Sequence, residues 1–570
     1  MNPITRRKFL AAGVSAGAAF LANAIAGSTA SGSPMRSTII RIPRSKKTGR
    51  VHPQAWLPDP PRAEQLRALA GVAMEAARSA GADFADIRIG VQRHIVVPQA
   101  GFSPNTGMSV GYGVRAWING TWSFQHGNLF TNDAVAAAAR SAVAGARTYA
   151  AVNQQLAQHF DAPVSAWAPA PVVTGEWRAP MEIDPFQVPL DDYFLVLGTL
   201  VDTTAPAWRL AVSAFALGWR AETRVFASTS GSMVTQEFLY GGATPRGVAG
   251  IAGGIGGEGG VEIDVPGPGP VIGGGFETVL DPNLVSRVMA GMDDAIRWRE
   301  LPERNFTDVG RFPILFDGAA TAGLIGYTMN LALDGDRVSG LEADASGGSF
   351  LSPAADILGA SSPQCSPLLT MTADRALPSA MAVQWDDDGV VPEPYALIDA
   401  GHVVDYHTTR ETAPMLADWY RHRGQPLRSH GTAVAPTPAS IPMGSCAHVH
   451  VTPSKGRTNV EDMMREISHG FFVRGGEPNV SPELTLGTMG SRDLVLEIQR
   501  GVPVARTYVP LQFATKTLLN KNLLALGGAN TARTATIVVE KGMPWQDIQQ
   551  LVTAPSALCK DVDVVGVVSA

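Results

Sequence analysis

The sequence predicts an α+β protein of two domains, in which the helices are segregated from largely antiparallel sheets. Three observations predict this class: helical and alternating apolar patterns in the first half, a Gly/Pro-rich run at residues 250–275, and a dominance of strand patterns after Phe312. The 570 residues are 45% hydrophobic and only 17% charged, which is typical of well-buried globular proteins. We therefore expect domains at 62–249 and 276–570, joined by a linker or loop at 250–275.

The amino terminus has the pattern of an export signal. Arg6 and Arg7 precede Lys8, and an apolar, alanine-rich run at 11–26 ends in two overlapping Ala-x-Ala sites. Paired arginines in this position are typical of the twin-arginine route, so residues 1–26 are expected to be removed and the mature chain to be periplasmic or extracellular. An ordinary secretory signal and an uncut membrane anchor are the alternatives. Residues 27–61 then form an extended lead-in, and no later run reaches the ~18 apolar residues of a membrane span.

Charge and cysteine content exclude some classes. Removal of the signal takes away three basic residues, so the formal net charge moves from −6 to −9, and no basic footprint for nucleic acid remains. The three cysteines, Cys365, Cys446 and Cys559, are odd in number and far apart, which argues against a disulfide framework. A single bridge between two of them stays possible, and the sequence does not choose the pair.

The first domain begins with an amphipathic helix at 62–80, where apolar residues recur at helical spacing. Residues 82–89 alternate as a strand, and residues 111–118 form a second strand that turns at Asn119-Gly120 into 121–124. Asn-Gly between alternating runs is a strong hairpin signal. A helix at 132–147 follows, with Asn132 or Asp133 as its cap.

The Gly/Pro-rich run has neither a Gly-Lys-Ser/Thr nor a strand-to-helix Gly-x-Gly-x-x-Gly frame, so a phosphate loop is the weaker interpretation. After it, the pattern predicts a helix at 281–298, strands from Phe312 onward, and one further helix at 460–470.

Several phrases together resemble the TldD/PmbA family, proteins described as modulators of DNA gyrase and as metallopeptidases. They are GYGVR at 111–115 with WSF at 122–124, WDDDG at 385–389, the stretch 395–412, and the passage 453–473. Their order over about residues 62–540 carries the resemblance. It implies a two-domain α+β fold, a dimer enclosing a cavity, and binding of unfolded peptide as an added strand, because main-chain hydrogen bonds tolerate any sequence.

The family's chemistry lies in a helix with the motif His-Glu-x-x-x-His. Its two imidazoles hold Zn²⁺, the Glu takes a proton from the metal-bound water, and a cysteine near the carboxyl end completes the site. The matching positions here are Gly326, Tyr327 and Leu331, and the chain contains no His-Glu pair. The resemblance therefore implies a divergent member with no metal and no catalytic residue at these positions, like the PmbA-type branch that pairs with a catalytic subunit. We interpret Cys559 as a small buried apolar residue rather than a ligand.

A rebuilt metal site is the alternative. Cys446, His448 and His450 alternate along one strand, so their side chains share a face and form a possible soft site for zinc. Against it, Val449 and Val451 would form the buried face and leave the histidines in solvent.

Two acidic groups have ordinary interpretations. The three aspartates at 386–388 precede Gly389 and predict a hydrogen-bonded, solvated turn rather than a cation site. A second set after the motif helix predicts a charged loop: Asp334, Asp336, Glu342 and Asp344.

The sequence thus predicts an exported, metallopeptidase-like protein of the TldD/PmbA type. We expect a non-catalytic or degenerate subunit that binds unfolded peptide, without a cofactor, as a homodimer or as a heterodimer with a catalytic member. The alternatives are an active metal-dependent peptidase with the rebuilt site, and an exported binding or scaffold protein without a peptide role.

Overall fold

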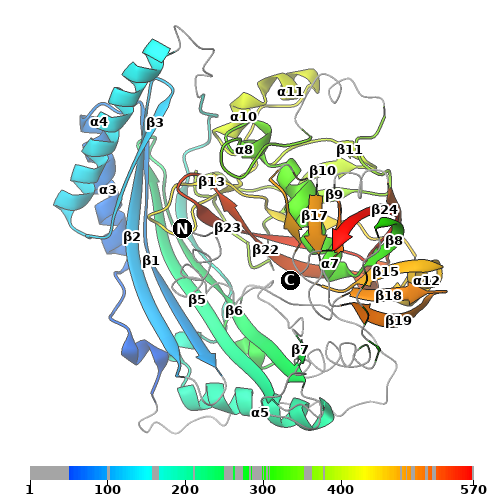
Figure 1. The fold of residues 1–570 in the computed structure, drawn as a ribbon. Helices are drawn as coiled ribbons and strands as arrows, with labels where there is room; N and C mark the ends of the chain where they lie inside the picture. The colour runs from blue at the N-terminus through cyan, green and yellow to red at the C-terminus, as the bar shows by residue number, and fades with distance from the viewer. Residues whose placement is uncertain are drawn as a thin grey trace, which may run out of the picture.

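The structure is a computed structural model. It describes residues 51–98, 103–156, 166–208, 212–249, 261–263, 274–281, 284, 298, 301–302, 304, 306, 309–351, 362–376, 379–456, 458–475, 478–482, 484, 486–489, 495–507, 511–515 and 522–567. The predicted export signal and lead-in lie largely outside these residues. Figure 1 shows an N-terminal domain of long, curved strands beside a more compact, strand-rich C-terminal domain.

The described strands of the N-terminal domain form one seven-stranded sheet of order β3-β2-β1-β5-β6-β4, with β7 paired to β6. All its pairs are antiparallel except β4 with β6. The strands are β1 (Phe84–Pro98), β2 (Asn105–Ile118), β3 (Thr121–Gly127), β4 (Thr174–Arg178), β5 (Val212–Ser228), β6 (Met233–Ala249) and β7 (Val261–Ile263).

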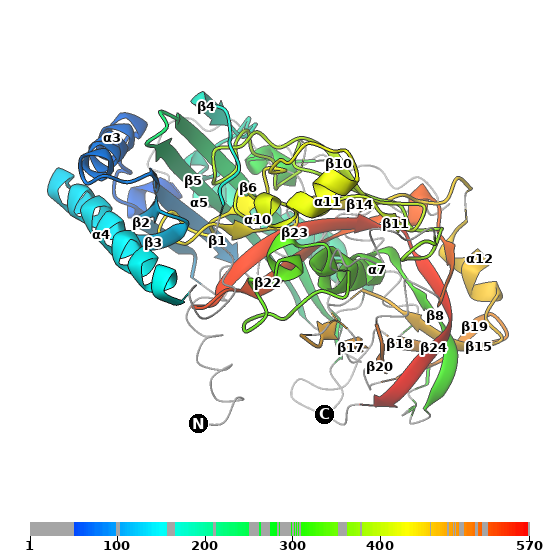
Figure 2. The ribbon, with the colours of Figure 1, turned by 90° about the horizontal axis from the view of Figure 1, so that it is seen from above.

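Strand alternation gives this sheet two different faces. Ile87 of β1 and Val114 of β2 point to one face, where they form a buried apolar cluster with helices α3 (Ala63–Ser79) and α4 (Asn132–Leu156). Figure 2 shows both helices on this side, with the C-terminal domain on the other side. The neighbouring positions in each strand therefore face the second domain, and they carry glycine and charged residues.

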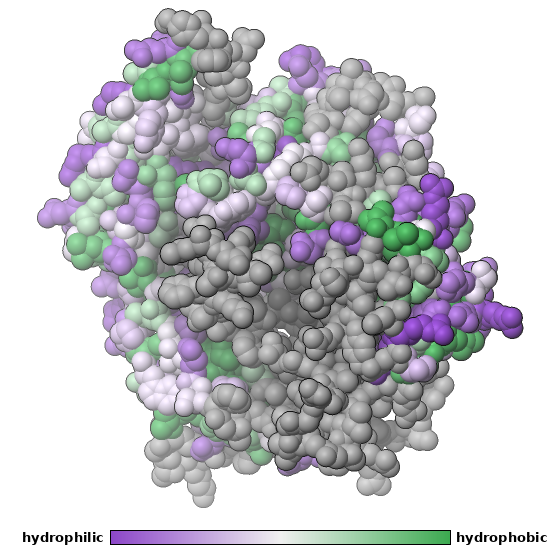
Figure 3. All heavy atoms as spheres, in the orientation of Figure 1, coloured by the Kyte–Doolittle hydropathy of each residue, from purple (hydrophilic) through white to green (hydrophobic). Residues whose placement is uncertain are grey.

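The predicted elements of this domain are present. The hairpin turn has left-handed backbone at both central residues, with φ of 47° at Asn119 and 78° at Gly120, which a two-residue hairpin of the favoured twist requires. The helix predicted at 132–147 continues to Leu156. At the far end of the sheet, helix α5 (Leu190–Trp208) packs on a second apolar cluster around Trp219. On the face drawn in Figure 3, hydrophilic and hydrophobic residues of this domain are interspersed in small patches.

The C-terminal domain is built mainly from two sheets. The described strands form a six-stranded sheet of order β11-β10-β9-β14-β23-β22 and a nine-stranded sheet of order β16-β17-β20-β24-β8-β15-β18-β19, in which β21 pairs with β24. Parallel pairs occur between β14 and β23 and between β15 and β8. The largest apolar cluster among the described residues lies between these sheets and the helix that starts at Gly318.

The bounds of the strands are β8 (Gly310–Phe316), β9 (Met371–Asp374), β10 (Tyr395–Asp399), β11 (His402–Val403), β12 (Ala433–Val434), β13 (Met443–Gly444), β14 (His448–Val451), β15 (His469–Val473), β16 (Asn479–Val480), β17 (Leu486–Met489), β18 (Val495–Gln499), β19 (Val502–Thr507), β20 (Leu511–Ala514), β21 (Leu523–Leu526), β22 (Arg533–Lys541), β23 (Gln546–Ala554) and β24 (Ala557–Val567). The helical segments are α7 (Gly318–Ile325), η4 (Gly326–Asn330), α8 (Gly335–Val338), α10 (Thr412–Met415), α11 (Ala417–His422) and α12 (Val460–Arg465).

The α+β class and the two-domain arrangement are as predicted, and one helix is shorter than expected. The helix predicted at 460–470 is capped by Asn459 and ends at Arg465, because His469 already begins β15. The Gly/Pro-rich run at 250–275 lies mostly outside the described residues, although β7 within it pairs with β6. The helix predicted at 281–298 also lies mostly outside them. Among the described residues, no helix is both long and apolar enough to cross a membrane.

Candidate functional site

The segment that matches the family motif is a π-helical turn. Helix α7 continues without a break into η4, whose wider turn spans Gly326–Asn330. In a π-helix, residues five apart are about one turn apart, which is the spacing of the first and last positions of His-Glu-x-x-x-His. Backbone suited to the motif is therefore present, while its side chains are not.

The three motif positions make other contacts. Gly326 lies so close to β22 that a Cβ there would be 2.5 Å from the Cγ1 atom of Ile537. Leu331 is buried in the apolar cluster. Tyr327 is partly buried, and its hydroxyl donates a hydrogen bond to the carbonyl of Val538 over 3.0 Å. These positions fill space and pair with backbone.

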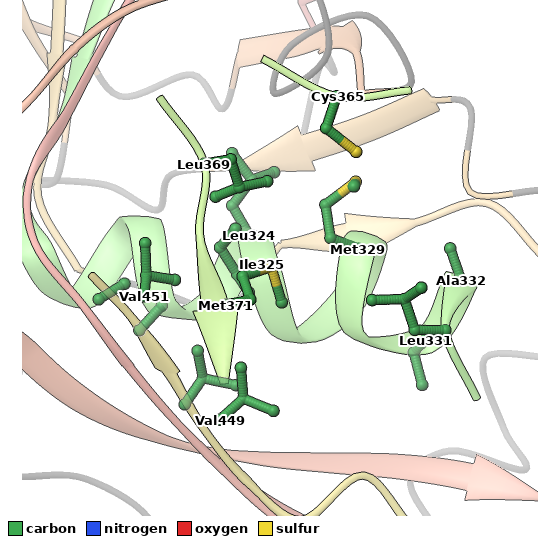
Figure 4. Packing of buried hydrophobic residues seen from close by; sticks show 14 of the residues in the cluster. Leu324, Ile325, Met329, Leu331, Ala332, Cys365, Leu369, Met371, Val449 and Val451 are labelled. Atoms are coloured by element: carbon green, nitrogen blue, oxygen red, sulfur yellow. The ribbon is translucent and has the colours of Figure 1, made fainter. Parts of the chain in front are cut away.

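Figure 4 shows how apolar the surroundings are. Leu324, Met329 and Leu331 on the helix lie among aliphatic and sulfur-containing side chains from neighbouring segments. Cys365 and Met371 are the sulfur-containing residues from neighbouring segments that the figure labels. Burial raises the pKa of the Cys365 thiol to about 12, so the metal-free thiol is protonated at neutral pH.

The alternative ligands Cys446, His448 and His450 are only partly brought together. The two imidazole rings lie side by side on β14, 4.1 Å apart, and Val449 and Val451 face the core as predicted. Cys446 precedes the strand, and its Sγ lies 3.4 Å from the carbonyl oxygen of Asn330.

The expected solvent exposure of these histidines is wrong for His448. Only 8% of His448 is exposed, because its Nδ1 lies 3.0 Å from the Ser379 hydroxyl and its Nε2 lies 2.8 Å from the Thr553 hydroxyl. Burial, with a contribution from His450, lowers the His448 pKa to about 3. Burial also raises the Cys446 pKa well above its usual range. Within the described part of the chain, no three His, Cys, Asp or Glu side chains form a group able to hold a metal ion.

A network of hydrogen-bonded polar side chains begins at the end of the π-helical turn. Asn330, at the end of the π-helical turn, donates to the Gln550 side chain over 2.6 Å, and its oxygen lies 2.8 Å from Nε2 of His407. Nδ1 of His407 lies 2.5 Å from the Tyr395 hydroxyl. Burial, and secondarily the charges of His430 and Lys541, lower the His407 pKa to about 3. A neutral imidazole therefore connects the helix to β10.

A buried ammonium holds the segment after the helix. Lys541 Nζ lies 2.5 Å from Asp334, 2.7 Å from Asp336 and 2.6 Å from the carbonyl of Gly444. Burial opposes the charge of the ammonium, but the two carboxylates outweigh it and raise the Lys541 pKa. The predicted charged loop is thus wrong for Asp334, Asp336 and Glu342, which are buried, and right only for the exposed Asp344.

The acidic turn at 386–388 is present but is not solvated. One carboxylate oxygen of Asp386 accepts hydrogen bonds from the backbone of Asp388 and Val390, and Gly389 has a φ of 77°. The three aspartates are 2–8% exposed. The turn is therefore buried, because it packs against the charged face of the N-terminal sheet.

Arginines from that sheet neutralise the turn. Arg115 lies 2.5 Å from Asp86 in its own domain and 2.6 Å from Asp388 in the other domain. Arg224 contacts both oxygens of Asp387 at 2.7 Å. Arginine can do this because its planar group presents several donors at once. No sequence pattern indicated these pairs, apart from charged residues at alternate positions of otherwise apolar strands.

Glycines allow the two domains to approach this closely. A Cβ at Gly90 would lie 3.0 Å from the ring of Pro438, and one at Gly113 would lie 3.0 Å from the Pro438 carbonyl. Arg410 accepts a backbone hydrogen bond from Ala168, and its guanidinium lies 4.5 Å from the ring centre of Trp167. The phrases at 111–115, 385–389 and 395–412, which are far apart in the sequence, therefore meet at one domain interface.

Glu411 lies at the boundary between the two ionic groups. Burial raises its pKa to about 7, Arg115 opposes this, and Asp336 and Asp388 add to it. Its side chain is partly buried. The described residues that cluster around the domain interface are thus paired charges rather than a set of metal donors.

Comparisons with known proteins agree with this architecture. Residues 309–566 match the family model described as the PmbA/TldA metallopeptidase C-terminal domain. A comparison with curated proteins gives no match.

Solved structures similar to this one extend over both domains. TldE from Thermococcus kodakarensis is 15% identical with a TM-score of 0.59, covering 87% of this chain and 100% of that chain. A provisionally named modulator of DNA gyrase from Bacteroides thetaiotaomicron is 13% identical with a TM-score of 0.59, covering 88% of this chain and 98% of that one. A similarly named protein from Thermotoga maritima is 13% identical with a TM-score of 0.57, covering 87% and 99%. The match over residues 309–566 places the C-terminal domain in the PmbA/TldA metallopeptidase C-terminal domain family, and the solved structures share the two-domain fold of this chain.

Proposed function

We propose that this chain is an exported, non-catalytic TldD/PmbA-family subunit that binds unfolded peptide at the edge of β22. The observation that carries the non-catalytic role is the π-helical turn, where Gly326, Tyr327 and Leu331 replace every donor of the family motif and pack against β22 and the core. Without a metal-bound water and a base, hydrolysis of a peptide bond has no nucleophile at this position.

The peptide-binding role rests on the geometry of β22. This nine-residue strand ends the order of its sheet and pairs only with β23 among the described strands. Val538 lies opposite Gln549 in the register, and the carbonyl of Gln549 accepts a hydrogen bond from Ser445, away from β22. The two residues are therefore a non-hydrogen-bonded pair, so the backbone groups of Val538 point to the free edge.

The same alternation applies to Glu540, two residues further along the strand. Its side chain is exposed, and that of Val538 is partly exposed. An extended peptide can pair with these backbone groups whatever its sequence, which suits an unfolded substrate. Dimerisation with itself or with a catalytic family member, and twin-arginine export to the periplasm, complete the proposal.

The test compares three properties of the full chain purified from its native compartment. A fluorescent unfolded peptide is expected to bind, the metal content is expected to be far below one per chain, and peptidase activity is expected to be absent with or without a chelator. Glu540→Pro removes one edge N–H without changing the core, so it should weaken binding at least fivefold, whereas Glu540→Ala keeps the N–H and should bind like the wild type.

Two outcomes would contradict the proposal. Stoichiometric zinc together with chelator-sensitive cleavage, both lost in His448→Ala, would indicate a peptidase with a rebuilt site at Cys446, His448 and His450. Absence of any peptide binding would leave the exported scaffold role instead. Recovery of a second family member with His-Glu-x-x-x-His in a periplasmic pull-down would support the paired-subunit form.

A further inference from the structure

The replaced motif positions act together at the edge of β22. Because Gly326 has no side chain, the helix lies directly against Ile537 of that strand. This approach brings the next residue, Tyr327, to the strand, where its hydroxyl hydrogen-bonds to the carbonyl of Val538. That carbonyl belongs to the edge that faces away from β23.

We propose that Tyr327 is a gate on peptide binding, with its hydroxyl occupying the position that the N–H of an added strand would take. The inference rests on the proposed peptide-binding role of β22. A residue pairing opposite Val538 would donate its N–H to this carbonyl and accept the N–H of Val538. The phenol ring must therefore leave before the strand can add, so an unliganded chain holds its own edge closed.

The proposed gate also accounts for a tyrosine, rather than the glutamate of the family motif, at position 327. A carboxylate at position 327 could only accept hydrogen bonds and would repel the carbonyl of Val538, whereas a phenol hydroxyl donates to it. The residue that stands where the family has its catalytic base is thus suited to contact the strand to which the peptide would pair.

The test measures affinity for a fluorescent unfolded peptide in Tyr327→Phe. Loss of one competing hydrogen bond is expected to tighten binding about fivefold. Tyr406→Phe is the matched control, because the Tyr406 hydroxyl also donates to a backbone carbonyl, that of Leu351, at 2.7 Å. This control should leave the affinity unchanged. If Tyr327→Phe fails to fold by circular dichroism, Tyr327→Met replaces it.

The outcomes separate this inference from the proposed function. If Glu540→Pro abolishes binding but Tyr327→Phe binds no more tightly than the wild type, the gate is wrong and the peptide-binding edge stands. If Glu540→Pro binds peptide like the wild type, the edge of β22 is not the peptide-binding site, and the proposed role of Tyr327 is wrong as well. If the wild type binds weakly or not at all while Tyr327→Phe binds, the gate is supported; if neither binds, it is overturned.

Discussion

Arg115 lies on β2 with its guanidinium between Asp86 of its own domain and Asp388 of the other. Burial disfavours the charge of this guanidinium, but the two carboxylates outweigh that effect and raise the Arg115 pKa. Buried ion pairs contribute little net stability, yet removal of one partner leaves an uncompensated buried charge. Single residues at this interface therefore have effects much larger than those of surface pairs.

Replacement of Arg115 by Met should lower the free energy of unfolding by about 3–5 kcal/mol, because Asp86 and Asp388 lose their shared partner. Urea unfolding followed by tryptophan fluorescence measures the change. Arg421→Met is the control, since Arg421 pairs with Asp418 at the surface and should change stability by less than about 1 kcal/mol. Equal losses in the two variants would mean that the interface pair has no special role.

The buried imidazole of His448 predicts a loss of stability in acid. Its pKa is about 3 in the folded chain, below the ordinary 6.5, so the unfolded chain binds more protons between these values. Stability from this group is complete above pH 6.5 and decreases as the pH falls, by about 2 kcal/mol between pH 7 and pH 5. Urea unfolding at the two pH values should show a difference about 2 kcal/mol smaller in His448→Gln. An unchanged difference would indicate that His448 takes up its proton without unfolding.

At the scale of elements, the residues at the family-motif positions of the π-helical turn serve as packing contacts. Gly326 has ordinary helical backbone angles, with φ of −60° and ψ of −44°, so no turn requires glycine there. The requirement comes from Ile537 on β22, which occupies the space of a Cβ. The backbone therefore has the spacing of the family motif, but the space beside it does not admit the side chains of that motif.

Substitution of Gly326 by Ala should reverse the usual effect of this change. In an open helix position Ala stabilises by about 1 kcal/mol, but here the overlap with Ile537 should destabilise by about 1–3 kcal/mol. Gly71→Ala in α3 is the matched control, because a Cβ there meets nothing within 4 Å. Thermal or urea unfolding of both variants gives the signs.

The same overlap limits any restoration of the motif. An imidazole at position 326 is larger still, so the triple variant Gly326→His, Tyr327→Glu and Leu331→His should not bind zinc unless Ile537 is also made small. In an Ile537→Ala background, Gly326→Ala should become stabilising. Continued destabilisation in that background would place the conflict elsewhere.

At the scale of the whole molecule, the acidic turn at 386–388 docks one domain on the other. Asp387 and Asp388 meet Arg224 and Arg115 from the N-terminal sheet, and Gly90 lets the segment around Pro438 lie on the same face. The contacts join residues that are 163 and 273 positions apart. A few buried ion pairs therefore join the two domains.

Neutralising this turn should loosen the domains. In the double variant Asp387→Asn and Asp388→Asn, Arg224 and Arg115 lose charged partners, and amide exchange at residues 386–390 should accelerate about 100-fold, as a loss of roughly 3 kcal/mol implies. Hydrogen exchange with mass spectrometry measures this. Glu393→Gln, in an exposed pair with Arg428, should leave exchange unchanged. Unchanged exchange in the double variant would show that apolar contacts alone hold the domains.

Local patterns in the sequence were enough to predict several elements of the N-terminal domain. Alternation predicted β1 and β2, helical spacing predicted α3, and Asn119-Gly120 predicted the hairpin, because each depends on neighbours within a few residues. The absence of donors at Gly326, Tyr327 and Leu331 is also a property of the sequence alone.

Only the tertiary structure decided which charges are buried. Asp388 lies in an acidic turn that ends in glycine, and Asp334 follows a helix; both local patterns are typical of solvent-exposed residues. In the structure both are buried, because Arg115 and Lys541 from distant segments form ion pairs with them. In the same way, the contact of the Tyr327 hydroxyl with Val538 follows from the packing of a helix on a strand about 200 residues later. Burial and ion pairing depend on neighbours that are distant in the sequence, and residue type and local spacing do not predict those neighbours.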